Sequence, residues 1–191
     1  MRKLLLVYLL TGIFSCAFAG DWQVDSKAKN SIVFNSSTTL LDFEGKTENI
    51  DGYIYWEGEK VFGEKNELYF EVQLNTFDTG NGKRDRDMRN DVLHTKSYPV
   101  VSFKGNFIKV ENSGSHYKVI VKGQMDLHGK KQEMEIPGTI EMMESKMNLK
   151  SSFSIFLKDY NIEAPSLAAF IKVAEEIKLD LDFNLKKLEN E

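Results

Sequence analysis

The sequence predicts an all-β fold, an antiparallel sandwich or barrel in a single domain. Apolar and polar residues alternate over many short segments of the 191-residue chain, as they do in strands with one buried face. Short turn signals such as Glu44-Gly45 and Asn112-Ser113-Gly114 separate these segments. The chain shows no internal repeat and no low-complexity linker. Repeated alternation with short connections is typical of antiparallel sheets that bury one face.

The first residues are expected to direct export rather than to belong to the fold. Two cationic residues precede an apolar run, Leu4–Phe14, that is too short to span a bilayer. Ala17-Phe18-Ala19 then matches a small-x-small cleavage site. We therefore predict a signal peptide over residues 1–19 and a mature domain over residues 20–191, periplasmic or secreted. Cleavage before Cys16, which would leave a lipoprotein, is the alternative.

The cysteine count and the net charge exclude or disfavour several kinds of site and partner. Cys16 is the only cysteine, so a chain cleaved after Ala19 has no disulfide, thiolate nucleophile or cysteine-based metal site. The net charge of −4 becomes −6 once the leader with Arg2 and Lys3 is removed, which disfavours nucleic acid as a partner. The mature chain is also expected to have no integral membrane segment. Lys83–Arg89 is a local cationic exception and a candidate contact for an anionic group.

Nine segments are predicted as strands. The clearest is the last, Ile177–Leu185, in which apolar residues occupy one face and charged or amide residues the other. The remaining strands are expected around residues 32–34, 41–43, 50–56, 68–74, 101–103, 117–121, 134–136 and 147–157.

The segment Phe77–Phe103 interrupts this pattern with a charged connection of about twenty residues, far longer than a hairpin loop. Its apolar residues, among them Met88 and Leu93, favour an ordered cover over part of the fold. Within it, Asp85–Leu93 lacks a strand period and predicts a short helix. Pro165–Ile171, which has leucine and alanine after a proline, predicts a second short helix at a barrel end or on its flank.

The strongest catalytic signal is Asp78-Thr79-Gly80, because aspartic peptidases carry such a loop. Their chemistry needs two carboxylates that share one proton, and the sequence has no second loop of this kind. A polar turn is the favoured interpretation, and a single-lobed aspartic hydrolase using Asp78 is the enzymatic alternative. The three histidines, His94, His116 and His128, match no ligand spacing, so neither a metal nor a cofactor is expected.

Several short motifs resemble the signature of the YceI-like family, exported lipocalin-like proteins that bind polyisoprenoids. They are Asp78-Thr79-Gly80-Asn81, Arg84-Asp85, Met88-Arg89, Tyr98-Pro99, the opening Asp21–Asp25, Gly123–Gly129, Phe153–Asp159 and the closing Val173–Leu181. The resemblance covers essentially the whole mature chain. It departs from the family at Asp87, where members often carry histidine, and just before Tyr98, where the segment is about one residue short.

The resemblance implies an eight-stranded antiparallel lipocalin-like barrel with one or two short helices. It also implies an apolar lumen that takes a polyisoprenoid, an isoprenoid quinone or another long-chain lipid, for transport or storage rather than turnover. The protein is therefore not expected to be an enzyme. The expected partner is the lipid, with a homodimer as a further possibility. A barrel that holds no ligand and binds another exported protein through its surface is the non-enzymatic alternative.

Residues on the apolar faces of the strands and in the cover are the candidate ligand contacts, although for any single one an ordinary core position is the favoured interpretation. The candidates are Phe34, Phe70, Val72, Leu74, Met88, Leu93, Phe103, Val119, Phe153, Ile155, Leu179 and Leu181. Arg84 and Arg86 are candidates for contact with a phosphate or quinone head. The alternative for Arg84 and Asp85 is that they pair with neighbouring loop groups and hold the cover in place.

Overall fold

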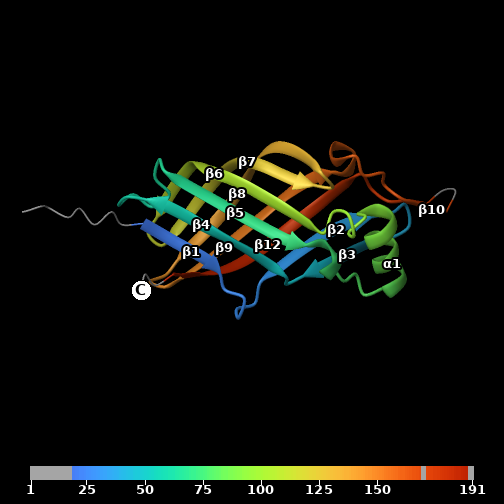
Figure 1. Ribbon diagram of the computed structural model, residues 1–191, viewed down its shortest axis with the longest axis horizontal. Coiled ribbons are helices and arrows are strands. Elements are labelled where there is room, and N and C mark those ends of the chain that lie inside the picture. Colours follow the sequence, from blue (N-terminus) through green and yellow to red (C-terminus); the bar gives the residue numbers. More distant parts are fainter. Residues whose placement is uncertain (1–18, 169–170, 189–191) are drawn as a thin grey trace, which may run out of the picture.

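Eight antiparallel strands close into an elongated barrel, as the family resemblance implies (Figure 1). The computed structural model describes residues 19–168 and 171–188, so the expected signal peptide lies outside the described residues except for Ala19. Around the ring the strands follow the order β1 (Ala19–Val24), β4 (Ile50–Glu57), β5 (Asn66–Gln73), β6 (Val100–Ser113), β7 (His116–Leu127), β8 (Lys130–Met142), β9 (Lys146–Phe156) and β12 (Glu176–Lys187).

Two further strands, β2 (Ser31–Ser37) and β3 (Asp42–Thr47), complete the wall at one end. One edge of β12 pairs with β9 along almost its whole length, while the opposite edge is shared between β2 and β1. β3 lies beside β2, and the backbone of its Lys46 exchanges two hydrogen bonds of 2.9 Å with Asp78. The wall at this end is therefore joined to the segment that follows β5.

The seam between β8 and β9 is shorter than its neighbours. Within the described strands its ladder stops at the pair Gly138 and Ser151. The next residue of β8, Pro137, has no N–H to donate, and its carbonyl accepts a 2.6 Å hydrogen bond from Ser151 Oγ. Further along, Gln132 Nε2 donates to the carbonyl of Asp159 at 2.7 Å. Side-chain hydrogen bonds thus join β8 to β9 and to the 3₁₀ turn that follows β9 where the backbone ladder is missing.

The helical segment predicted within Asp85–Leu93 is confirmed. The helix α1 (Gly82–Asp87) continues into one wider π-helical turn, η2 (Met88–Val92), and α1 lies at the right-hand end of the barrel in Figure 1. The Asn81 side chain accepts hydrogen bonds from the first helical N–H groups and so caps α1. Short 3₁₀ turns follow β5 and β9, at Leu74–Thr76 (η1) and Leu157–Tyr160 (η3).

The second predicted helix, over Pro165–Ile171, is wrong. The described residues of this segment form part of a two-stranded hairpin, β10 (Ser166–Ala168) and β11 (Ile171–Lys172), while residues 169 and 170 lie outside the described ones. A helix of about two turns is marginal without tertiary support, so local propensity decides little here. Pairing decides instead, because Val173 N donates to the Pro165 carbonyl and Val173 bridges to the end of β2.

Candidate functional site

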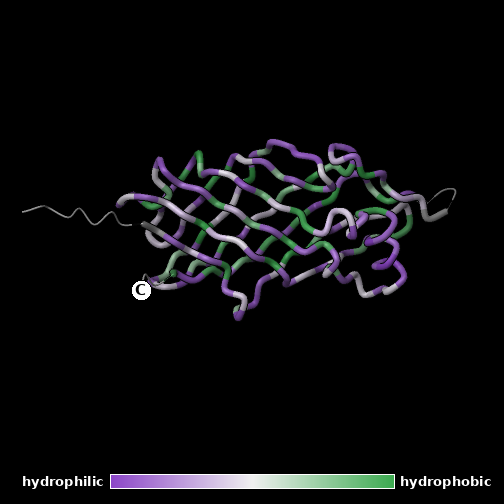
Figure 2. The backbone as a smooth tube through the Cα atoms, in the orientation of Figure 1, coloured by the Kyte–Doolittle hydropathy of each residue, from purple (hydrophilic) through white to green (hydrophobic). Residues whose placement is uncertain are grey.

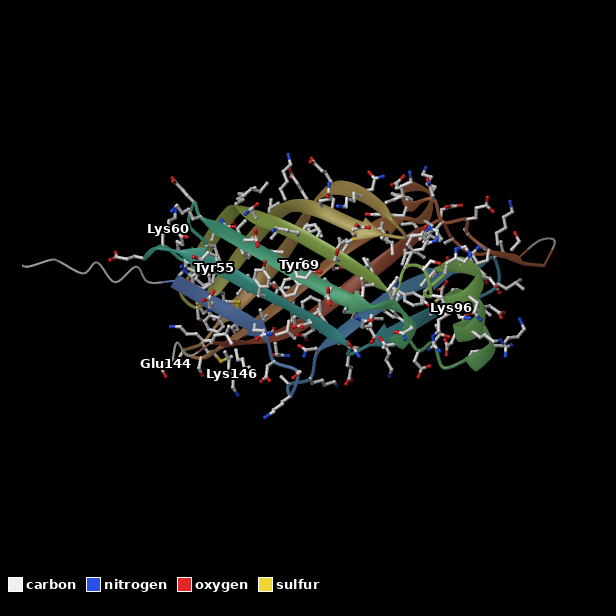
Figure 3. All side chains as sticks on the ribbon, in the orientation of Figure 1. Tyr55, Lys60, Tyr69, Lys96, Glu144 and Lys146 are labelled. Atoms are coloured by element: carbon white, nitrogen blue, oxygen red, sulfur yellow. The ribbon has the colours of Figure 1, made fainter. Side chains whose placement is uncertain are left out.

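An aromatic plug closes one end of the barrel. Phe62, on the loop between β4 and β5, is only 3% exposed and packs against Trp56, Phe107 and Tyr117 with ring centroids 4.3 to 5.6 Å apart. The buried Asn66 side chain ties this loop to β6 through hydrogen bonds with the backbone of Phe107. Lys60 on the same loop marks this end in Figure 3, opposite Lys96 near α1.

Beyond the plug the barrel is hollow. A cavity of about 830 Å³ runs to the end that carries α1, within the range of roughly 300–1,000 Å³ that is usual for small-molecule sites. Hydrophobic and hydrophilic residues alternate along the strands (Figure 2). Most residues that line the cavity are apolar. The sequence patterns thus produce a lumen in one part of the barrel and a filled core in the other.

All twelve residues proposed from the sequence as ligand contacts line this cavity. Their contact with a ligand stays a prediction. The cavity wall also includes residues outside that set: Ile32, Phe43, Leu68, Phe77, Val101, Val121, Met125, Leu127, Ile136, Leu149, Leu157, Ile177 and Phe183. Most of them continue the same alternation, so the sequence signal for them was present. Phe62, the centre of the plug, had no such signal, because it lies in a loop and not on an alternating strand.

The mouth of the cavity is polar and its charges are balanced. Lys83, Arg84, Asp87 and Asp91, all from α1 and η2, line it. Lys83 Nζ lies 2.7 Å from an Asp87 carboxylate oxygen, four residues along the chain. Arg86 is not among the lining residues and its side chain is largely exposed. The sequence therefore indicates the correct segment, but only one of its two headgroup candidates reaches the mouth.

The cover formed by α1 and η2 is anchored by the loop before it. Asp85 accepts hydrogen bonds from the N–H and Oγ1 of Thr79 at 3.0 and 2.6 Å. The Arg84 guanidinium donates to Thr79 Oγ1 and to its carbonyl, both at 2.8 Å, and stacks over the ring of Phe43. Arg89 Nη2 donates to the carbonyl of Phe77 at 2.8 Å. The alternative considered for Arg84 and Asp85, that they hold the cover in place, is what the contacts show.

Asp85 should make the stability of the cover depend on pH. Burial raises the pKa of its carboxyl, but the Thr79 hydrogen bonds and the charges of Arg89 and Arg84 outweigh burial and leave the pKa below its usual value. A lowered pKa stabilises the fold above the ordinary aspartate pKa, about 3.9, and this contribution is lost as pH falls through the folded-state value.

We expect Asp85→Asn to lower the free energy of unfolding by about 2 kcal/mol at pH 7, the scale of hydrogen bonds to a charged group. Urea denaturation at pH 7 and pH 3 measures the free energy of unfolding of both proteins. The difference in this free energy between the variant and the natural chain should shrink at pH 3. Asp51→Asn, an exposed carboxylate on β4, is the control. A difference that stays constant between the two pH values would contradict the assignment.

Asp78 does not line the cavity. One of its carboxylate oxygens accepts the N–H of Gly80 at 2.7 Å, the local turn expected of this residue type. The described residues contain no second Asp-Thr-Gly loop. The arrangement gives Asp78 a role in the turn that leads into α1, and no contact in the described residues favours the hydrolase alternative.

Two leucines stand at the rim of the mouth. Leu40 and Leu41, in the turn between β2 and β3, are 73% and 53% exposed and both line the cavity. The turn is held by Thr38, whose hydroxyl accepts hydrogen bonds from the N–H groups of Leu40 and Leu41. These are the two most exposed large apolar side chains among the described residues. Leu40 has no strand signal, and Leu41, which the alternation places on a predicted strand over residues 41–43, lies in the turn just before β3 begins at Asp42.

None of the described helices is long and apolar enough to cross a membrane.

Among curated proteins, no sequence matches this chain. Several solved structures share its fold. A polyisoprenoid-binding domain from Saccharophagus degradans is 20% identical with a TM-score of 0.72, covering 87% of this chain and 98% of its own. BcnA from Burkholderia cenocepacia is 16% identical with a TM-score of 0.68, covering 84% and 98%.

A third structure, the YceI protein of Campylobacter jejuni, is 15% identical with a TM-score of 0.57 and covers 76% of this chain and 85% of its own. At these identities the likeness establishes the fold alone. The family is established by sequence, because the model of the YceI-like domain matches residues 22–185, from within β1 to near the end of β12. The chain therefore belongs to the YceI-like family.

Proposed function

We propose that this protein binds a long-chain isoprenoid or a similar amphiphilic lipid in its cavity, and that it transports or stores this lipid in the periplasm. The observation that carries the proposal is an apolar cavity with one plugged end and one polar mouth. The polyisoprenoid-binding domain of Saccharophagus degradans, which shares the fold, supports the ligand class. The leader sequence supports export.

Apolar contact is sufficient to hold such a ligand. Burial of one methylene group is worth about 0.8 kcal/mol, so ten buried carbons contribute roughly 8 kcal/mol. The loss of translational and rotational freedom on association costs at least about 4 kcal/mol. A lipid chain can therefore bind without a specific polar contact, and we expect the cavity to select for chain length and girth before headgroup.

The direct test is to produce the full chain with its leader, purify it from the periplasm without detergent, extract it with organic solvent and identify lipids by mass spectrometry. We expect about one isoprenoid or similar long-chain lipid per protein. A chain that carries no lipid and takes up none when isoprenoids are added would refute the carrier function. N-terminal sequencing of the same sample separates a start at Gly20 from a lipid-modified Cys16.

The balanced charge of the mouth predicts a preference for neutral headgroups. Removal of two mouth carboxylates by Asp87→Asn with Asp91→Asn should leave Lys83 and Arg84 in excess. We expect affinity for an isoprenyl phosphate to rise about threefold or more, since surface charge pairs are worth up to about 1 kcal/mol, while affinity for a neutral isoprenoid stays the same. Competition against a fluorescent lipid measures both. Glu144→Gln, at the plugged end (Figure 3), is the control, and equal gains for both lipids would contradict the prediction.

The rim leucines predict that the protein contacts the membrane from which it takes up the lipid. A long apolar chain crosses water poorly, and the rim is continuous with the cavity. Leu40→Ser with Leu41→Ser should slow lipid uptake from neutral phosphatidylcholine vesicles about tenfold, because two apolar contacts with the bilayer are lost. The amount bound at equilibrium should fall much less than the rate of uptake, because many other apolar side chains line the cavity. Met143→Ser, 51% exposed at the turn between β8 and β9, is the matched control. Unchanged uptake in the double variant would exclude the contact.

A further inference from the structure

The fold brings together two histidines that are far apart in the sequence. His94 follows η2 at the end of the cover, and His128 lies in the turn between β7 and β8. His94 Nδ1 and His128 Nε2 are 3.1 Å apart, with the ring centroids separated by 5.3 Å. The pair therefore joins the cover to the rim of the barrel, at a site that does not line the cavity.

Both rings are held in position by the backbone and by a neighbouring side chain. His94 and His128 have left-handed backbone conformations, with φ of 46° and 54°, which residues other than glycine adopt at a cost. The Tyr98 ring lies 4.3 Å from that of His128. A Cβ on Gly129 would approach Tyr98 to 2.8 Å, so the turn needs glycine there. Strained residues that the surrounding contacts fix in place are a common feature of binding sites.

The separation of the two nitrogens suits a shared metal ion. Imidazole nitrogens bind Zn²⁺ at about 2.0–2.1 Å, which places two of them about 3.3 Å apart at a tetrahedral angle. At a right angle, as in tetragonal Cu²⁺ or Ni²⁺ sites, the separation is about 2.9 Å. The observed 3.1 Å lies between these values. In this contact one ring donates a hydrogen and the other accepts it. For both inner nitrogens to become ligands, that hydrogen moves to the outer nitrogen of its own ring and the two rings turn so that both lone pairs point at the ion.

We infer that His94 and His128 form a binding site for a transition-metal ion that accepts imidazole ligands, such as Cu²⁺, Ni²⁺ or Zn²⁺. Among the described residues no group of three or more histidine, cysteine, aspartate or glutamate side chains is arranged around a metal position, so water completes the coordination. The ion is exchangeable and fastens the cover to the rim. Because it binds the folded pair and not the separated residues, it also stabilises the fold.

The test uses the untagged mature chain, which contains no cysteine and three histidines if the leader is cleaved as expected. Isothermal titration with Cu²⁺ and Zn²⁺ should give one site per chain. His94→Asn and His128→Asn should each weaken binding at least tenfold; asparagine is chosen because it tolerates left-handed backbone. His116→Asn is the control, since His116 lies near Ser115 and Glu141, away from the pair. Equal affinity in all variants, or loss only with His116→Asn, would overturn the site.

A second measurement needs no variant and so is independent of folding defects. Histidine modification by diethyl pyrocarbonate, followed by peptide mapping of the natural chain, reports each ring separately. Cu²⁺ should protect His94 and His128 at least fivefold and leave His116 reactive. Equal protection of all three rings, or of none, would contradict the inference.

Discussion

Ile155→Asp is expected to abolish lipid binding while the barrel stays folded. Ile155 lies on β9, is buried, and lines the cavity. In the empty protein water in the cavity can hydrate the new carboxylate, but a bound lipid would displace that water. Burial of an unpaired charge costs several kcal/mol, and about 2.7 kcal/mol corresponds to a hundredfold loss of affinity. We expect lipid recovered by mass spectrometry to fall at least tenfold, with unchanged circular dichroism.

Ser154→Asp is the matched control for this change. It adds the same carboxylate one position earlier on β9, on the outer face, where Ser154 is exposed and opposite Lys178 of β12. Lipid content should equal that of the natural chain. If Ile155→Asp folds and retains its lipid, the cavity is not the binding site.

Phe62→Ala is expected to cause the largest loss of stability of any change proposed for this protein. The ring is the centre of the plug, and removal of a buried phenylalanine typically costs about 3–5 kcal/mol. For a chain of this size 1 kcal/mol corresponds to about 2–4 °C, so the melting temperature should fall by roughly 6–20 °C. Thermal unfolding followed by circular dichroism measures the shift.

The control for Phe62→Ala is Phe156→Ala. Phe156 is 42% exposed at the end of β9 and contacts Lys158 from the outside, so its removal leaves no buried hole. Its expected effect is below about 1 kcal/mol. Equal shifts for the two variants would show that the plug contributes nothing beyond ordinary surface packing.

Strand alternation predicted more of this protein than any motif did. Residues such as Val72 and Leu179 were assigned to the lumen side because side chains alternate between the two faces of a strand, and both line the cavity. The same argument cannot tell a hollow barrel from a filled one. At the plugged end the filling centres on Phe62, whose place inside the barrel is fixed by the path of a loop and not by any period in the sequence.

Predictions from local sequence failed where contacts between segments far apart in the chain determine the structure. Pro165–Ile171 has helix-forming residues, yet its described part pairs as strands because Val173 meets the end of β2. His94 and His128 gave no metal spacing, because their proximity arises only when the cover folds back on the β7–β8 turn. Arg84 lines the mouth and Arg86 does not, because residues two positions apart on the helix α1 point to nearly opposite sides. The sequence spacing alone does not say which of the two faces the mouth.

The incomplete ladder between β8 and β9 has a mechanical consequence. A cylinder whose seams are all equally bonded resists widening in every direction, whereas one with short ladders yields along those lines first. Two ladders around the ring are short, β1 with β12 and β8 with β9, but β2 pairs with further residues on the same edge of β12, whereas within the described strands the β8–β9 line has no such additional strand. Here the weak line passes Pro137, Gly138 and Ser151, which line both the cavity and a shallow groove on the outer wall. We expect the barrel to widen along the β8–β9 seam, so that the cavity accommodates thinner and thicker lipid chains while the remaining ladders stay intact.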